Sequence, residues 1–222
     1  MVLGKQGAGK GTQADRLARH YGIPHVSTGD MFRASVKDDT EAGRRVKTYM
    51  EHGELVPDEV VIDVVAERLD RHDVGDEGFV LDGFPRNVAQ AEALDEMLGE
   101  EGVDLVLELQ VPTDVVLARL EGRRVCTGCG KNYSVENPPA QDWICDRCGS
   151  KVVPRHDDTE TAIKRRLAVY EKQTEPLVAW YMAKDKLAAV DGTGAPDTVT
   201  TRLLRAAESR LAEPADPARG RR

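Results

Sequence analysis

Aromatic residues are scarce in this sequence, and so are long hydrophobic runs. Phe, Trp and Tyr make up 5% of the 222 residues, so aliphatic side chains must fill most of any core. No apolar run approaches the roughly 18 residues that a membrane-spanning helix needs. The N-terminus also lacks the basic-then-apolar pattern of a secretion signal. We therefore expect a cytoplasmic protein without a membrane partner.

Positive charge is also in short supply. The chain has 31 Lys and Arg residues against 39 Asp and Glu residues, which gives a formal net charge of −8. This balance disfavours a surface that holds nucleic acid by electrostatic attraction, so we expect no nucleic-acid partner. The length suits one sizeable core with small inserts. The sequence shows no sustained heptad pattern, and we expect a monomer.

A glycine-rich stretch lies almost at the start of the chain, from Gly4 to Thr12. Its spacing is G-x-x-x-x-G-K, and a helical pattern follows directly. The backbone N–H groups of such a loop can point at phosphate oxygens, and Lys10 adds a positive charge beside the β- and γ-phosphates. Gly11 stands where Ser or Thr is usual, with the hydroxyl delayed to Thr12. The stretch predicts a phosphate-binding P-loop; a glycine-rich turn that only caps a helix is the alternative.

Strand and helix patterns alternate through most of the chain. A short strand precedes the loop, and the helix after it has an apolar stripe of Ala14, Leu17, Ala18 and Tyr21 that we expect to pack in the core. Further strands are expected from His25, at Phe79–Asp82, at Val103–Val111 and at Leu187–Val190. Further helices are expected at Val61–Leu69, Val88–Leu98, Thr113–Glu121, from Thr159 to a kink or break before Pro176, and at Val199–Leu211. This alternation predicts an α/β fold with a parallel sheet.

Three segments depart from the pattern. Residues 27–56 are polar and charged with short helical stretches, which indicates a small excursion from the core. Residues 123–158 have no hydrophobic periodicity. Residues 213–222 are rich in Pro, Ala and charge, and we expect them to form a disordered tail.

The four cysteines all fall in the second of these segments. They follow the pattern Cys126-x2-Cys129-x15-Cys145-x2-Cys148, which is typical of a four-cysteine zinc site. A closed site with four protein ligands has no open position for a substrate, so we expect a structural role for the metal. Two disulfides or four free thiols are the alternatives, and a reducing compartment disfavours the disulfides.

The ordered set of motifs resembles the adenylate kinase family, in its long-lid form with four zinc-binding cysteines. The P-loop is followed by Ser27-Thr28-Gly29-Asp30-Met31, then by the most diagnostic stretch, Leu81-Asp82-Gly83-Phe84-Pro85-Arg86. Gly122-Arg123-Arg124-Val125 resembles the start of the family's lid, Arg155-His156-Asp157-Asp158 its exit, and Val190-Asp191-Gly192-Thr193 the last strand and loop. The resemblance runs in order over nearly all of the chain before the tail.

This resemblance implies a P-loop nucleoside monophosphate kinase fold. Its core would be a five-stranded parallel sheet flanked by helices, formed by residues 1–26, 57–122 and 159–212. Residues 27–56 would be the part that binds the nucleoside monophosphate, and residues 123–158 would be a zinc-bearing lid. The implied reaction is reversible phosphoryl transfer from MgATP to AMP, giving two ADP, in purine salvage and adenylate energy balance.

The resemblance also assigns residues to the two nucleotides. ATP would contact Gly7, Ala8, Gly9, Lys10, Gly11, Thr12, Arg119, Arg123, Asn132, Tyr133 and Gly194. AMP would contact Thr28, Arg33, Met50, Glu54, Leu55, Val56, Gly83, Phe84, Pro85, Arg86, Gln90, Arg155 and Arg166.

Catalysis would depend on positive charge rather than on a general base, because an AMP phosphate is already largely ionised near pH 7. The expected catalytic residues are Lys10, Arg86, Arg119, Arg123, Arg155 and Arg166. Magnesium would be held mostly through water molecules, which Asp82 and Asp30 would orient. A closing lid would exclude water, the competing acceptor.

Three other interpretations stay open at this point. A related enzyme could use another acceptor, such as UMP or CMP. The chain could be a zinc-ribbon nucleic-acid binder driven by a nucleotide switch, with Tyr133 and Trp143 as stacking residues. It could also be a regulatory module that binds nucleotides without turnover.

Overall fold

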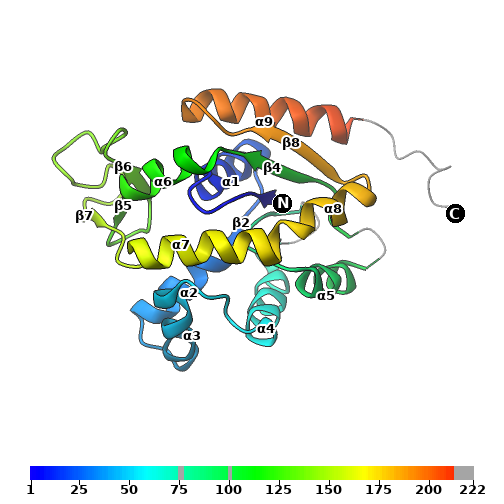
Figure 1. Ribbon diagram of the computed structural model, residues 1–222, viewed down its shortest axis with the longest axis horizontal. Coiled ribbons are helices and arrows are strands. Elements are labelled where there is room, and N and C mark those ends of the chain that lie inside the picture. Colours follow the sequence, from blue (N-terminus) through cyan, green and yellow to red (C-terminus); the bar gives the residue numbers. More distant parts are fainter. Residues whose placement is uncertain (75–77, 100–101, 213–222) are drawn as a thin grey trace, which may run out of the picture.

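A five-stranded parallel sheet forms the centre of the molecule (Figure 1). The computed structural model describes residues 1–74, 78–99 and 102–212, and the predicted tail lies outside them. The strand order is β2-β3-β1-β4-β8. The strands are β1 (Val2–Leu3), β2 (His25–Ser27), β3 (Val80–Asp82), β4 (Val106–Gln110) and β8 (Leu187–Asp191). The predicted fold class is therefore confirmed.

The first strand is short but central. Val2 pairs in parallel with Asp82 of β3 on one side and with Leu107 of β4 on the other. Both residues of β1 are buried, at 2% and 4% exposure, so the chain enters the core at once. The P-loop therefore starts from the middle of the sheet.

Helices cover both faces of this sheet. Because neighbouring residues of a strand point to opposite faces, Val2 and Leu3 belong to two different apolar clusters. The first cluster contains residues of α1 (Lys10–Tyr21), α6 (Thr113–Glu121), α7 (Glu160–Val169) and α9 (Pro196–Leu211). The second contains residues of α4 (Asp58–Leu69), α5 (Val88–Leu98) and α8 (Pro176–Ala183). Within the described ranges, no helix has the length and apolar content to span a membrane.

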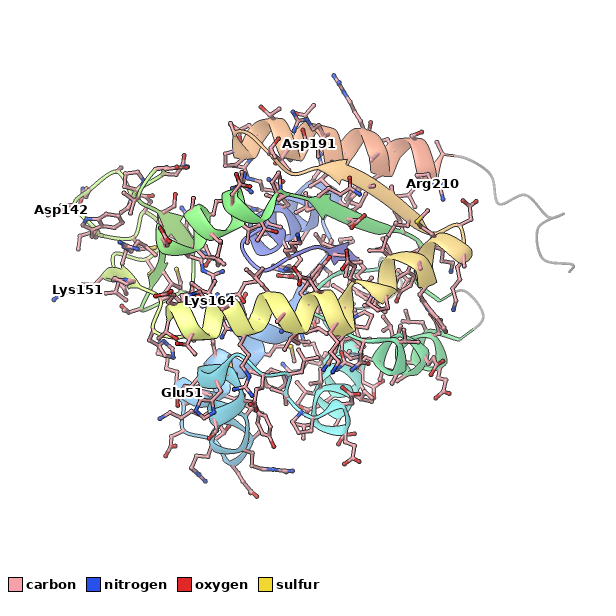
Figure 2. All side chains as sticks on the ribbon, viewed as in Figure 1. Glu51, Asp142, Lys151, Lys164, Asp191 and Arg210 are labelled. Carbon is pink, nitrogen blue, oxygen red and sulfur yellow. The ribbon has the colours of Figure 1, made fainter. Side chains whose placement is uncertain are left out.

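Charged side chains occupy the outer surfaces. Glu51, Lys151 and Lys164 are exposed, and Glu51 and Lys151 lie at the edge of the molecule in Figure 2. A short 3-10 helix, η1 (His72–Val74), follows α4.

The prediction that Tyr21 packs in the core is wrong, because its side chain is 38% exposed. Gly22 ends α1 in a left-handed conformation, and the N–H of Ile23 bonds to the carbonyl of Ala18. In this kind of helix end the residue after the glycine folds back onto the last turn. Ile23 therefore packs against the core cluster where helical spacing alone would put Tyr21. Leu211, at the end of α9, is likewise 55% exposed.

The kink or break expected before Pro176 takes the form of a π-helical turn, and no loop interrupts the helix. Between α7 and α8 the chain forms a wide π-helical turn, η2 (Tyr170–Thr174), and Pro176 then opens α8. Proline has no N–H to donate, so a helix that continues past it must change its hydrogen-bond pattern.

Residues 27–56 form a pair of helices, α2 (Thr28–Lys37) and α3 (Glu41–His52). The side chains of Ser27 and Thr40 cap them, accepting from the N–H groups of Asp30 and Gly43 respectively. The two helices form a separate arm beside the sheet (Figure 1).

Residues 123–158 have more regular structure than their sequence predicts. They contain a three-stranded antiparallel sheet of order β6-β5-β7. Its strands are β5 (Arg123–Cys126), β6 (Asn132–Ser134) and β7 (Val152–Pro154). Strands of three or four residues are too short to show an alternating pattern in the sequence.

Gly43 allows α2 and α3 to pack closely. A Cβ at this position would lie 2.0 Å from the carbonyl oxygen of Ser35. We predict that Gly43→Ala lowers the free energy of unfolding by about 1–3 kcal/mol, because the backbones must separate. Gly122→Ala is the matched control, since its Cβ would meet no atom closer than 3.6 Å. Urea unfolding of both variants measures the effect, and equal stability of the two would contradict it.

Candidate active site

One cleft of about 1540 Å³ opens at the carboxyl ends of the parallel strands. All of the residues predicted to contact a nucleotide or the magnesium waters line this cleft, with the exception of Phe84. The ring of Phe84 is 1% exposed and packs in the apolar core beneath the turn that carries Pro85. The predicted residues of the core, of residues 27–56 and of residues 123–158 thus face a common space.

The P-loop joins β1 to α1, and its glycines are required by its shape. Gly7 has φ 85°. A Cβ there would lie 2.8 Å from Leu120, so a larger residue could not fit against α6. Gly9 caps α1 in a left-handed conformation, which leaves the helix N-terminus open toward the cleft.

Lys10 folds back over this loop. Its Nζ donates hydrogen bonds to the carbonyls of Gly4 at 2.7 Å and Lys5 at 3.0 Å. Burial and the nearby arginines lower the pKa of Lys10 to about 8, although Asp82 opposes the shift. An anion in the loop would satisfy this ammonium group better than the carbonyls do.

Asp82 lies beside the loop at the end of β3. A Cβ on Gly11 would be 3.3 Å from Asp82 Oδ2, so the missing side chain at Gly11 leaves room for this carboxylate. Burial would raise the pKa of Asp82, but interactions with His25 and Lys10 outweigh it and lower the pKa. His25 Nε2 stands 3.8 Å from Asp82 Oδ2. An ionised carboxylate at this position fits the oxygen-rich surroundings that magnesium prefers.

Three of the predicted arginines converge on two neighbouring carboxylates. Arg123 holds Asp158 with two hydrogen bonds of 2.5 Å. Arg155 holds Asp157 at 2.6 and 2.8 Å. Arg166 contacts both aspartates, at 2.9 Å for Asp157 and 3.3 Å for Asp158. This network joins the first and last residues of segment 123–158 to Arg166 in the last turn of α7.

Sequence reasoning assigned no role to Asp157 and Asp158. Their side chains are buried, with 1% and 4% exposure. In the sequence, the two acidic residues stand in the stretch that resembles the exit of the family's lid, separated from Arg155 by His156.

The remaining arginines occupy the two ends of the cleft. Arg119 donates to the carbonyls of Ala8 and Gly192 at 3.2 and 3.1 Å, so it lies between the P-loop and the turn after β8. Arg33 pairs with Asp30 on α2. Arg86 donates from Nε to the carbonyl of Gly83 at 2.7 Å.

These cations are crowded together. Burial lowers the pKa of Arg33, Arg86 and Arg123, and repulsion from neighbouring arginines adds to it. The pKa of Arg86 falls to about 10, which still leaves it protonated at neutral pH. The cleft therefore favours a ligand that carries several negative charges.

Thr28 and Gln90 close the end of the cleft near α2. Thr28 Oγ1 donates to the carbonyl of Gly83 at 2.9 Å. Both ends of the Gln90 amide are engaged: Oε1 accepts from the N–H of Arg86 at 2.8 Å, and Nε2 donates to Asp58 at 2.7 Å. If Gln90 is to contact a nucleotide base, one of these two hydrogen bonds must be replaced by a bond to that base.

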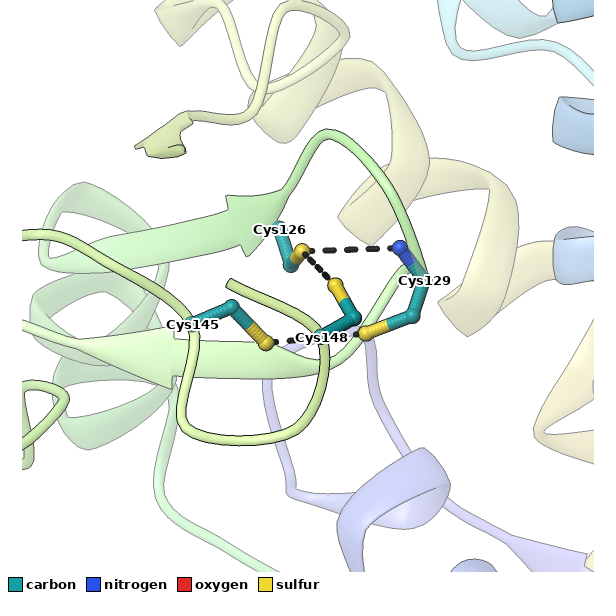
Figure 3. A group of neighbouring side chains, drawn as sticks. All are labelled: Cys126, Cys129, Cys145 and Cys148. Carbon is teal, nitrogen blue, oxygen red and sulfur yellow. Dashed lines mark hydrogen bonds between the residues drawn. The ribbon is translucent and has the colours of Figure 1, made fainter. Parts of the chain in front are cut away.

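The four cysteine thiols meet in segment 123–158 (Figure 3). Their sulfur atoms all lie within 4.8 Å of one another. The Cys126–Cys148 and Cys129–Cys145 sulfur pairs are 3.4 and 3.6 Å apart, too far for a disulfide. Zn–S bonds of about 2.3 Å place tetrahedral sulfurs about 3.8 Å apart, so the cluster fits a zinc ion.

Hydrogen-bond donors surround these sulfurs, as a cluster of thiolates requires. The N–H groups of Gly128 and Cys129 point at Cys126 Sγ, each at 3.4 Å. The hydroxyl of Tyr133 lies 3.4 Å from Cys145 Sγ and accepts from the N–H of Asp146 at 2.9 Å. Tyr133, predicted to contact ATP, thus directs its hydroxyl into the cysteine cluster.

Two further contacts fix this segment over the cleft. Lys37 of α2 donates to the carbonyl of Thr127 at 3.1 Å, next to Cys126 of the cysteine cluster. Gln6 of the P-loop donates to Asp158 at 3.1 Å. Each contact joins residues that are more than 80 positions apart in the sequence, and no sequence pattern indicates it.

The fold and the site together define a class of protein. The chain has a P-loop after a central strand, an ionised carboxylate on the neighbouring strand and a group of arginines over a shared cleft. These are the features of a P-loop phosphotransferase.

Comparison with known proteins identifies the family. The family model for adenylate kinase matches residues 2–186. The adenylate kinase of Lachnospira eligens is 48% identical over 208 residues, which cover 92% of this chain and 97% of that protein. Those of Clostridium perfringens and Thermodesulfovibrio yellowstonii are 50% and 52% identical over 202 residues, or 90% of this chain and 93% and 94% of theirs. The chain belongs to the adenylate kinase family.

Asp157 makes the arginine network sensitive to acid. Burial would raise its pKa, but Arg155 and Arg166 outweigh this effect and hold the pKa far below the usual 3.8. An aspartate with a lowered pKa stabilises the folded state at pH values above the pKa that it has in the unfolded chain. This stabilisation is lost as the pH falls below about 4. We predict that Asp157→Asn lowers the free energy of unfolding by about 3 kcal/mol at pH 7, with a difference from the unsubstituted protein that shrinks toward pH 3.

Urea unfolding between pH 7 and pH 3 measures this difference. Asp63→Asn, on an exposed position of α4, serves as the control and should change little at any pH. A constant gap between Asp157→Asn and the unsubstituted protein over the whole range would contradict the prediction.

Proposed function

We propose that this protein catalyses reversible phosphoryl transfer from MgATP to AMP, giving two ADP. One observation carries the proposal: cationic side chains from the P-loop, α2, the turn after β3, α6, the lid segment and α7 face one cleft of about 1540 Å³. A polyphosphate that joins two nucleotides needs such a surface along its whole length. Family membership supports the same reaction.

ATP would bind at the P-loop end. The backbone of Gly7 to Thr12 would hold its phosphates together with Lys10, and Arg119 and Arg123 would approach from the other side. Asn132 and Tyr133 of β6, and Gly194 after β8, would border the base and ribose. Magnesium would supply charge neutralisation between the phosphates, and Asp82 and Asp30 would orient its waters.

AMP would bind at the end near α2 and α3. Arg33 and Arg86 would hold its phosphate, joined by Arg155 and Arg166 at the position of transfer. Thr28, Met50, Gln90 and the backbone from Glu54 to Val56 would border the base. Gly83 to Pro85 would contribute backbone, with the ring of Phe84 supporting that turn from the core.

The chain's own groups act by position and charge. The attacking phosphate oxygen needs no base, so the arginines would align it with the γ-phosphoryl group and stabilise charge on the transferring oxygens. Guanidinium groups suit this task because each presents a planar fork of donors. The lid segment would exclude water from the same space.

The parts of the fold would divide this work. Residues 1–26, 57–122 and 159–212 would form the core, 27–56 the AMP-binding arm and 123–158 the lid, which zinc on Cys126, Cys129, Cys145 and Cys148 would stiffen. We propose that the protein acts as a monomer in the cytoplasm and without nucleic acid. The completeness of the site within one chain and the net charge of −8 support this proposal.

The acceptor is tested by a coupled assay that follows ADP formation from MgATP with AMP, GMP, CMP or UMP. Rapid ADP formation with AMP alone is expected. Turnover with a different monophosphate would move the specificity to the surroundings of Thr28 and Gln90. Nucleotide binding without turnover for any acceptor would contradict the proposed reaction.

Arg86→Ala tests the charge at the transferring phosphate. We predict a fall in kcat of about 10³-fold, by analogy with arginines that stabilise phosphoryl transfer. Arg71→Ala is the control because Arg71 is exposed at the end of α4 and pairs only loosely with Glu67, at 3.6 Å. Similar activity in both variants would show that Arg86 does not contact the reacting groups.

Zinc removal tests the role of the lid. We predict that chelation, followed by assay in excess magnesium, lowers the Tm and kcat together, and that added zinc restores both. The physical reason is that the short strands β5 to β7 have a small apolar core of their own. Full turnover after verified loss of the metal would refute this role.

A further inference from the structure

The π-helical turn between α7 and α8 brings a buried hydroxyl to the active site. In η2 the N–H of Glu175 bonds to the carbonyl of Tyr170 at 2.9 Å, five residues back. Turns of this kind are rare, and they occur frequently at functional sites. The one that precedes Pro176 contains Thr174, for which the proposed reaction has no assigned role.

Thr174 is directed away from its own helix. Its side chain is 6% exposed, and Oγ1 donates to the carbonyl of Arg86 at 2.7 Å. Within helices, a threonine hydroxyl commonly bonds to a carbonyl of the preceding turn. Thr174 is the last residue of the π turn, and its hydroxyl bonds to the carbonyl of Arg86 instead of a carbonyl of its own helix.

Arg86 is held from three directions. Its N–H donates to Gln90 at 2.8 Å, its Nε donates to the carbonyl of Gly83 at 2.7 Å, and its carbonyl accepts from Thr174. The neighbouring cations Arg33, Arg155 and Arg166 repel its guanidinium group. Fixed backbone contacts therefore keep Arg86 in a place that charge repulsion alone would disfavour.

The same helix carries Arg166 in the last turn of α7, eight residues before Thr174. Arg166 lies in α7, and η2 continues that helix without a loop (Figure 1). The helix thus links the position of Arg166 to that of Arg86, through the bond from Thr174.

We propose that Thr174 is a positioning residue for Arg86, whose hydroxyl, presented by the π turn, fixes the Arg86 backbone so that its guanidinium stays aimed at the transferring phosphate. This inference rests on the proposed phosphoryl transfer. Thr174 makes no contact with the substrates in this account, and it acts through Arg86 alone.

Thr174→Val tests the proposal because it removes the hydroxyl and keeps the shape. We expect kcat to fall about tenfold, the size of effect that loss of one buried hydrogen bond can produce, with the KM for MgATP unchanged within about twofold. Thr174→Ser keeps the hydroxyl and should retain kcat within about threefold. Thr201→Val, whose hydroxyl bonds a carbonyl of its own helix, should leave kcat unchanged.

A double-mutant cycle separates positioning from a general loss of structure. In the Arg86→Ala background, Thr174→Val should have no further effect on kcat, since the residue it positions is absent. A tenfold loss in both backgrounds would overturn the proposal, as would a Thr174→Ser variant as slow as Thr174→Val. If Thr174→Val does not fold, as judged by its Tm, Thr174→Ala is judged by the same criteria.

The unsubstituted protein, assayed in the same series, separates this inference from the proposed function. Absence of AMP-dependent ADP formation in that protein would refute the reaction itself. An active unsubstituted protein with equal kcat in Thr174→Val would refute only the role of Thr174.

Discussion

Positive charge buried at one end of a parallel sheet is the constraint on which the rest of the structure depends. Lys10, Arg33, Arg86 and Arg123 all have a lowered pKa because water is excluded and other cations are near. Asp157 and Asp158 hold some of these groups in place. A cluster of buried cations is unfavourable when no anion is bound. A bound polyphosphate would relieve the repulsion, and residues 27–56 and 123–158 would become ordered around it.

The sheet determines where this charge gathers. In a parallel sheet all carboxyl ends lie at one edge, so the segments that follow β1, β2 and β3 meet there although they are far apart in sequence. They supply the P-loop, Thr28 and the run from Asp82 to Arg86. Helix α7 returns to the same edge with Arg166, and its π turn brings Thr174 under Arg86. The position of each polar group thus depends on how the apolar side chains of its strand or helix pack.

The sheet, the P-loop and the cysteine cluster could be predicted because each has a signal in consecutive residues. Tyr21 was misplaced because the left-handed Gly22 turns Ile23 back onto the core, which helical periodicity does not represent. The sequence does not indicate the strands of residues 123–158 because they are too short to alternate. Contacts made by Gln6, Lys37, Asp158 and Thr174 depend on how distant elements are placed, so no local pattern could have indicated them.

The central claim is that the cleft brings two nucleotides together and excludes water. The most direct measurement is ³¹P NMR of one sample that contains the protein, MgATP and AMP, because it follows every phosphorus species at once. We expect ATP and AMP to decline in step while two ADP form for each AMP, with no inorganic phosphate. Release of inorganic phosphate at a rate independent of AMP would contradict it.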